Sequence, residues 1–197
     1  MKKRLLILLM LALMLVLCAC GEPQSPEDRA QQFLSTLLAD DAELQQAILD
    51  NVTVIGEGVP QPTEEEEAAR KERADRLQEL VRDRFDGLAS PELIDKNATD
   101  GQLTYWQTML AYCGVKASIT DCSFTDDGSC LAFNAEVHCT NGEDERDMPM
   151  WGEIYFNDDG LIDSYKLYHD IQGFTGWLWA QDRSGFNERI NGPVEQP

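Results

Sequence analysis

The chain has 197 residues, 43% of them hydrophobic, and its 16 lysine and arginine residues stand against 36 aspartate and glutamate residues, a net charge of −20. This acidity argues against binding to nucleic acid, or to an anionic membrane surface through protein side chains. The hydrophobic content is that of a globular domain rather than a disordered chain.

The first residues predict a signal peptide over residues 1–19. Lys2, Lys3 and Arg4 form a positive segment, and residues 5–17 are an unbroken apolar run of thirteen residues. A membrane-spanning helix needs roughly 20 apolar residues, so this run has the length of a signal-peptide core instead. An ordinary secretory signal is the main alternative, and a retained membrane helix is less favoured.

The run ends in the sequence LCACG, residues 17–21, which resembles a bacterial lipobox. The resemblance implies that Cys20 receives a diacylglycerol and becomes the mature N-terminus, while Cys18 leaves with the signal. Acyl chains supply about 0.8 kcal/mol per buried CH₂ and hold a domain at a membrane without a span. We therefore expect a protein anchored through Cys20 in the outer leaflet of the bacterial cell membrane, on its extracytoplasmic face, with 20–25 as a short tether. The mature charge would be −23, from 13 basic and 36 acidic residues.

Helical periodicity dominates the chain up to residue 114. Ser25 precedes a proline and can cap a helix, and Thr63 with Glu66 forms a capping box. Thr99 to Gln102 reads as a further capping box. The predicted helices are residues 25–48 with a break at 40–41, residues 63–85, a short helix from residue 90, and residues 103–113.

After Gly114 the apolar period changes to two, which is typical of strands. The predicted strands are residues 115–124, 130–140, 148–157 and 161–169, joined by glycine-containing turns such as Asn141-Gly142. Helices followed by strands indicate an α+β fold, with N-terminal helices packed on a four-stranded antiparallel meander sheet. We expect one domain over residues 26–190 and a frayed tail over 191–197.

Besides Cys20, four cysteines remain after the signal, Cys113, Cys122, Cys130 and Cys139, and outside the cytoplasm they could form disulfides. They lack a CxxC pair, so a structural zinc site is not expected. Four cysteines allow three pairings, and spacing alone does not choose among them. If the TDDG turn at residues 125–128 contains a three-residue hairpin loop, the strand register favours nested bridges Cys113–Cys139 and Cys122–Cys130.

Two segments resemble NTF2-like (cystatin-like) domains of small bacterial lipoproteins. They are the opening SPEDRAQQFLSTLLADDAELQQAI and the closing MWGEIYFNDDGLIDSYKLYH. The resemblance implies a cone, in which a curved sheet wraps against helices around a pocket. Some members of this family are isomerases or dehydratases, and many only bind ligands or proteins. No catalytic pair of the family matches a position here, so no site is carried over.

Aromatic residues are concentrated in the C-terminal half, and aromatic walls with a few polar groups build small-molecule sites. The alternative is that each ring fills the core. The candidate pocket residues are Trp106, Trp151, Tyr155 and Tyr165.

Catalytic and metal motifs are weak. His138 and His169 have no assigned partner and are interpreted as surface or edge residues. No Gly-x-Ser-x-Gly elbow appears, and the acidic turns 126–128 and 157–160 do not match a calcium loop. No cofactor and no metal is expected.

These observations favour a non-catalytic module that binds a small molecule or an envelope protein. One alternative is a small pocket enzyme, an isomerase or a hydrolase, that uses acids near the aromatic rings. Buried carboxyl groups with raised pKa values would favour this enzyme. The other is a structural partner in an envelope complex, which a large exposed apolar patch would favour.

Overall fold

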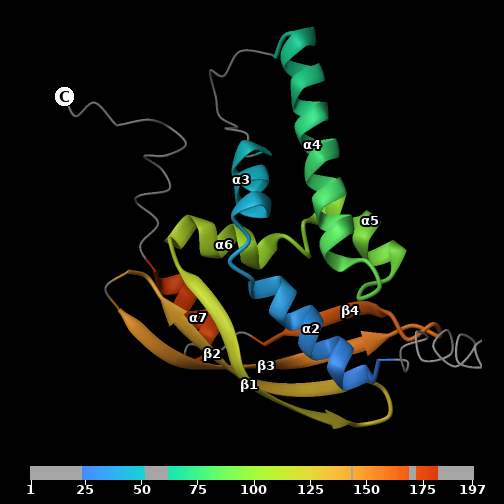
Figure 1. The fold of residues 1–197 in the computed structure, drawn as a ribbon, viewed down its shortest axis with the longest axis vertical. Helices are drawn as coiled ribbons and strands as arrows, with labels where there is room; N and C mark the ends of the chain where they lie inside the picture. Colours follow the sequence, from blue (N-terminus) through green and yellow to red (C-terminus); the bar gives the residue numbers. More distant parts are fainter. Residues whose placement is uncertain (1–23, 52–61, 143, 169–171, 182–197) are drawn as a thin grey trace, which may run out of the picture.

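The computed structural model describes residues 24–51, 62–142, 144–168 and 172–181. The predicted signal peptide, Cys20, His169 and the predicted tail lie outside these residues. Within the described part, five helices precede a sheet and one follows it (Figure 1). The elements are α2 (Pro26–Leu38), α3 (Ala42–Asn51), α4 (Glu64–Phe85), α5 (Pro91–Asp100), α6 (Tyr105–Cys113), β1 (Lys116–Asp126), β2 (Leu131–Thr140), β3 (Glu145–Phe156), β4 (Ile162–Leu167) and α7 (Phe174–Ala180).

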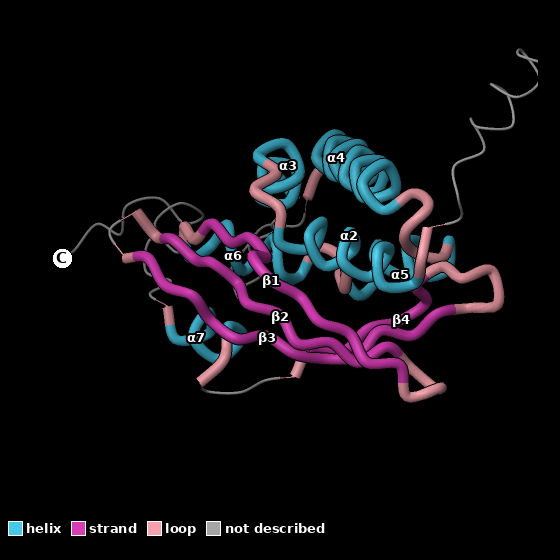
Figure 2. Tube along the Cα trace, turned by 60° about the horizontal axis from the view of Figure 1, so that its bottom comes forward, coloured by secondary structure: helices cyan, strands magenta, loops and turns pink. Residues whose placement is uncertain are grey.

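The strands form one antiparallel sheet in the order β1-β2-β3-β4. Every second residue of β2, beginning at Leu131, is buried, so one face of the sheet meets the core and the other faces outward. Figure 2 shows α2 to α5 together on one side of the sheet. The fold is therefore α+β, with helices on a four-stranded antiparallel meander, as predicted.

Strand β4 is short, and on β3 its partners are residues of the second half, from Gly152 to Phe156. Helix α7 packs against α6 and β3. Its Phe174 and Leu178 are fully buried, and the Phe174 ring lies 6.0 Å from that of Trp106. Helix α7 thus closes the core beside the part of β3 that β4 does not pair.

The helix ends follow the predicted caps in three places. The hydroxyl groups of Ser25, Thr63 and Ser90 each accept a backbone N–H of the first turn. The break between α2 and α3 falls where predicted, because the Asp41 carboxylate accepts the amides of Glu43 and Leu44 and starts a new helix.

The predicted capping box at Thr99 to Gln102 is wrong. Helix α5 runs on to Asp100 and ends at Gly101, whose φ of 64° is left-handed. The connection to α6 is held instead by Asn97, which is 5% exposed. Its side-chain oxygen accepts the amides of Leu103 at 2.8 Å and Thr104 at 3.1 Å.

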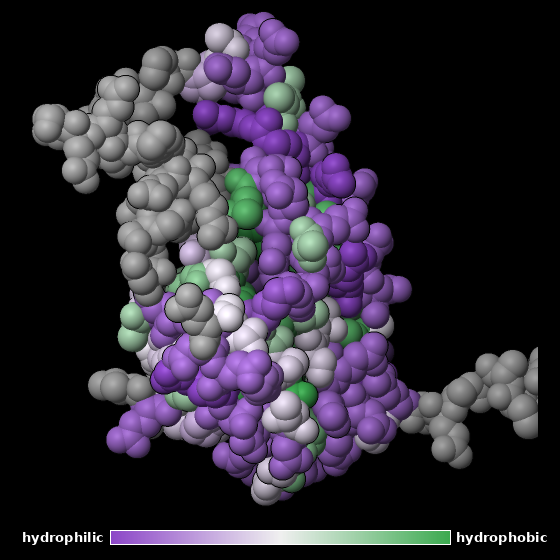
Figure 3. All heavy atoms as spheres, turned by 60° about the vertical axis from the view of Figure 1, so that its left-hand side comes forward, coloured by the Kyte–Doolittle hydropathy of each residue, from purple (hydrophilic) through white to green (hydrophobic). Residues whose placement is uncertain are grey.

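Helix α4 extends beyond the core beside α3 (Figure 1). Figure 3 shows the outer end of this arm covered by hydrophilic side chains. Asp41 and Glu43 at the start of α3 both accept hydrogen bonds from Arg84 of α4, at 2.6 and 3.2 Å.

None of the helices in the described ranges has both the length and the apolar character of a bilayer span.

The predicted disulfides are absent from the described residues, where all four cysteines are thiols. Cys122 pairs in register with Ala135, and the amide of Asp127 reaches the carbonyl of Cys130. The hairpin turns at residues 127–130, further along the chain than assumed, so Cys130 lies five residues along β2 from Ala135, the residue opposite Cys122, about 16 Å of strand. A disulfide needs Cα atoms within about 7 Å.

The Cys113–Cys139 bridge is likewise not formed. The Cys113 thiol donates to the carbonyl of Leu178 at 3.7 Å, and the Cys139 thiol donates to that of Val137 at 3.7 Å. Strand β1 places Ala117, not a cysteine, opposite Cys139. Each thiol thus donates to a backbone carbonyl.

Thiol labelling tests this arrangement. Burial, with a minor contribution from Asp121, raises the pKa of the Cys122 thiol to about 11, and burial raises that of Cys139 to about 12. Because the thiolate is the nucleophile, we expect iodoacetamide at pH 7.5 to leave both residues unmodified in the native chain and to modify both after unfolding in urea without reductant. Peptide mass mapping reads the result. Cysteines that resist labelling until a reductant is added would show that disulfides form after all.

Candidate functional site

The four predicted pocket residues do not line a common cavity. Trp106 is 4% exposed, and the Tyr165 ring packs edge-on against Phe33 with centroids 5.3 Å apart, so both belong to the core side. Trp151 and Tyr155 lie on the opposite face of the sheet, because they alternate with the buried Met150 and Ile154 along β3. The alternation that builds the sheet separates the predicted set into two pairs.

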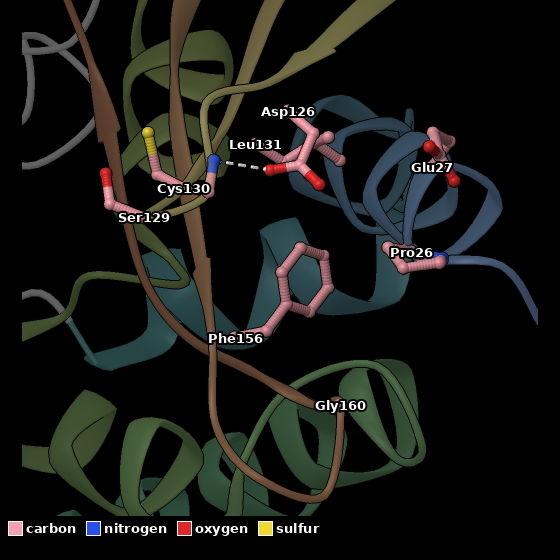
Figure 4. A pocket seen from close by; sticks show the side chains of 9 residues that line it. Pro26, Glu27, Asp126, Ser129, Cys130, Leu131, Phe156 and Gly160 are labelled. Carbon is pink, nitrogen blue, oxygen red and sulfur yellow. Dashed lines mark hydrogen bonds between the residues drawn. The ribbon is translucent and has the colours of Figure 1, made fainter.

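A cavity of about 260 Å³ lies at the turn end of the sheet, between the start of α2 and the two hairpin turns. In Figure 4 the ring of Phe156 faces this space and the carboxylates of Glu27 and Asp126 lie on its rim, while the Cys130 thiol points away. The Asp126 carboxylate accepts the amide of Gly128 at 2.7 Å. Its role is therefore to hold the turn, and the cavity lacks a set of convergent polar groups.

The outward face of the sheet carries a more organised group, which we call the tyrosine–carboxylate cluster: Glu153, Tyr155 and Tyr168. The Tyr155 hydroxyl donates to one oxygen of Glu153 at 2.6 Å, and the Tyr168 hydroxyl donates to the other. Both oxygens of one carboxylate are thus held by phenol groups from the same face.

Strand register explains this arrangement. Glu153 and Tyr155 are two residues apart on β3 and share a face. Lys166 of β4 lies directly opposite Glu153, and the amide of Tyr168 bonds to the carbonyl of Trp151 at 3.0 Å. The cluster therefore rests on the rigid pairing of β3 with β4, which orients its side chains better than a loop would.

The hydrogen bonds determine which groups are charged. Those from Tyr155 and Tyr168 lower the pKa of Glu153, and the bond to Glu153 raises the pKa of Tyr155 to about 12 and also that of Tyr168. Burial, with help from Asp127, raises the pKa of the neighbouring Cys130 thiol. At neutral pH the cluster is therefore a carboxylate between two neutral phenols, beside a protonated thiol.

Two side chains flank the cluster. The Lys166 ammonium lies 4.6 Å from the centroid of the Tyr168 ring, in cation–π geometry. The Trp151 ring stands against Gly173, where an added Cβ would lie 3.1 Å from it. Trp151, Glu153, Tyr155 and Tyr168 are all half-buried and Lys166 is exposed, so the group can be reached from solvent.

The outward face also brings serine, histidine and aspartate into one row. Ser118, His138 and Asp147 are consecutive register partners on β1, β2 and β3, and His138 Nδ1 lies 2.8 Å from an Asp147 oxygen. Within the described chain no hydrogen bond joins Ser118 to His138, and Ser118 is exposed on β1. The row therefore holds a cross-strand histidine–aspartate pair and not an assembled nucleophile.

The residues described here contain no group of three or more His, Cys, Asp or Glu side chains placed to hold a metal ion.

Sequence reasoning named Trp151 and Tyr155 but missed Glu153, Lys166 and Tyr168. A signal was present in the alternation Trp151-x-Glu153-x-Tyr155, which places a carboxylate between two aromatic rings on one strand face. Tyr168 could be added only once its pairing with β3 was known.

Comparisons with family models, with curated proteins and with solved structures find no match to this chain.

Proposed function

We propose that this protein is a lipid-anchored binding protein of the extracytoplasmic face, without catalytic activity, and that the tyrosine–carboxylate cluster is its ligand site. The single observation that carries the proposal is the placement of that cluster. It is a polar and aromatic group, oriented by strand pairing, on a sheet face that the helices α2 to α5 leave uncovered (Figure 2).

The anchor rests on the first twenty residues, with their positive segment, short apolar run and lipobox-like end at Cys20. Six residue steps separate Cys20 from Pro26, where α2 begins, and an extended chain of that length spans at most about 20 Å. The acyl chains would thus hold the domain close to the bilayer, with the start of α2 nearest to it.

The ionisation of the carboxyl groups supports binding over catalysis. A general acid working near neutral pH needs a raised pKa. In the described chain the carboxyl groups with a clear shift, Asp41, Glu66, Asp127 and Glu153, all have lowered pKa values. They are suited to hold a fixed negative charge, which serves recognition better than proton transfer.

The surface gives little support to a purely structural role. Over the described ranges the large hydrophobic side chains that are exposed are Tyr105 and Trp179, at 37% and 47%. Two aromatic rings fall short of the extended apolar patch that an obligate envelope partner would present. The NTF2-like family remains part of the proposal, supported by the quoted segments and by the order of helices before a meander sheet.

Two variants test the anchor. Cys20→Ser should leave a precursor that keeps its signal and incorporates no labelled palmitate, because the modified sulfur is gone. Cys18→Ser, the matched control two residues away, should be processed and labelled like the parent. Equal labelling of the two variants would place the lipid elsewhere or nowhere.

A native mass spectrum of the full chain, released from detergent micelles, tests the site. We expect a bound molecule that is lost from Glu153→Gln and kept by Ser164→Ala, a change at an exposed neighbour on β4. A bound molecule that persists in both variants would place the ligand site elsewhere in the protein.

A further inference from the structure

We infer that the tyrosine–carboxylate cluster binds a primary ammonium group, the lysine side chain of a partner protein, and that Lys166 is an internal competitor for the same position. This inference rests on the proposed function, since it names the ligand chemistry of the same site. It is carried by the hydrogen-bonding inventory of the cluster and by the position of the Lys166 ammonium.

The cluster presents acceptors and almost no donors. Each phenol of Tyr155 and Tyr168 uses its only O–H on Glu153, which leaves the lone pairs of both hydroxyl oxygens available. A carboxylate has about four acceptor positions, and the two phenols occupy two of them. The remaining capacity of all three groups can therefore be satisfied only by a donor.

An ammonium ion meets this requirement best, because it carries three donors and no acceptor. A neutral sugar needs donors as well as acceptors from its site. An anion would be repelled by the charge of Glu153 and by that of the nearby Asp127, which acts on Glu153 electrostatically. The net charge of −20 adds a long-range attraction for a basic partner.

The chain itself shows that an ammonium fits there. The Lys166 Nζ lies over the Tyr168 ring and acts electrostatically on Glu153, yet no ion pair joins Lys166 to Glu153 among the described residues. The aromatic face is thus occupied by a lysyl ammonium while the carboxylate keeps free acceptor positions. A lysine from a partner that displaced Lys166 could use both groups together.

The exposure of the site argues for a protein-borne lysine. The cluster is half-buried on the outward face of the sheet, with the exposed Lys166 beside it and Trp151 against Gly173. A free amine would gain only a part of its contacts on so open a face. A side chain presented by a partner surface would be covered from the other side.

The competition predicts that removal of the Lys166 charge strengthens the binding of a cationic probe. The probes are n-butylammonium chloride and the tripeptide Ac-Gly-Lys-Gly-NH₂. Each is titrated into the ¹⁵N-labelled full chain in zwitterionic micelles, and the chemical shifts of the Trp151 and Tyr168 amides measure binding. We expect Lys166→Gln to bind both probes about fivefold more tightly, because the cation–π contact no longer has to be displaced. Lys166→Arg keeps a competing cation and should resemble the parent.

Controls separate this inference from the proposed function. Glu153→Gln should lose binding of both probes, and the acetyl-lysine form of the tripeptide and n-butanol should not bind to any variant. Tighter binding of n-butylammonium than of the tripeptide would overturn the protein-borne lysine, and no gain of affinity in Lys166→Gln would overturn the competition.

If n-butanol or another neutral probe shifts the same amides, the ammonium inference fails while the binding function stands. If no probe shifts them and the native mass spectrum shows no bound molecule that depends on Glu153, both fail.

Discussion

Gly152→Ala should disrupt the sheet at the junction of β3 and β4. A Cβ at this position would lie 2.0 Å from the carbonyl oxygen of Lys166 and 2.9 Å from a ring carbon of Phe133. The first neighbour is backbone of a paired strand and cannot rotate away. We expect a loss of about 3 kcal/mol or more in the free energy of unfolding, or failure to fold. Urea unfolding followed by tryptophan fluorescence measures it.

Two further variants identify the cause. Ser164→Ala, on the exposed side of β4, should change stability by less than about 0.5 kcal/mol. Phe133→Leu combined with Gly152→Ala removes bulk from the ring but leaves the backbone clash, so the double variant should be no more stable than Gly152→Ala. Recovery of stability in the double variant would show that the ring, and not the strand pairing, requires the glycine.

Gln107→Leu should be the most damaging substitution of a polar residue in the helical layer. Gln107 is fully buried, and its amide nitrogen donates to the carbonyls of Leu37 at 3.2 Å and Ala39 at 2.6 Å. Its oxygen accepts from Gln45 at 3.2 Å. These bonds satisfy the C-terminal carbonyls of α2 and tie α6 to the α2–α3 break. We expect a loss of about 2 to 3 kcal/mol from the unfolding free energy, because buried carbonyls would be left unpaired.

The matched control is Gln46→Leu on α3, since Gln46 is exposed and bonds only within its helix, to Asp50. It should cost less than about 0.5 kcal/mol. Gln107→Glu keeps the size but turns a carboxylate toward carbonyl oxygens, so its deficit should shrink as the pH falls and the acid becomes a donor. An equal effect of Gln107→Leu and Gln46→Leu in urea unfolding would mean that these buried bonds contribute nothing to stability.

Local patterns predicted the elements well because their causes are local. The caps at Ser25, Thr63 and Ser90 lie within three residues of the amides they accept, and the period-two pattern of residues 130–140 reflects one strand facing one core. The exception, the predicted capping box at residues 99–102, failed for a longer-range reason. Asn97 offers an acceptor to the next segment, and α5 can therefore run on to Asp100.

Register was the quantity that the sequence left open, and the disulfide error traces to it, whereas the pocket error traces to the alternation of side chains along the strands. A hairpin turn that lies further along the chain than assumed put Cys122 opposite Ala135 and away from Cys130. Alternation across β3 and β4 likewise placed Tyr165 in the core and Tyr155 outside. A shift of a single residue reverses the face of every side chain in a strand, so even a good strand assignment does not determine a site.

The sequence by itself determined the fold class, the order of the elements and the acidic character, because these depend on composition, periodicity and caps within a few residues. Only the tertiary structure decided that Tyr168 reaches Glu153 fifteen residues away, that Lys166 lies over its ring, and that the cysteines remain thiols. Each of these depends on which residues of two strands stand opposite each other. Pairing between strands is a property of the assembled sheet, set by the turns and the packing of the whole core, and it is not contained in either strand alone.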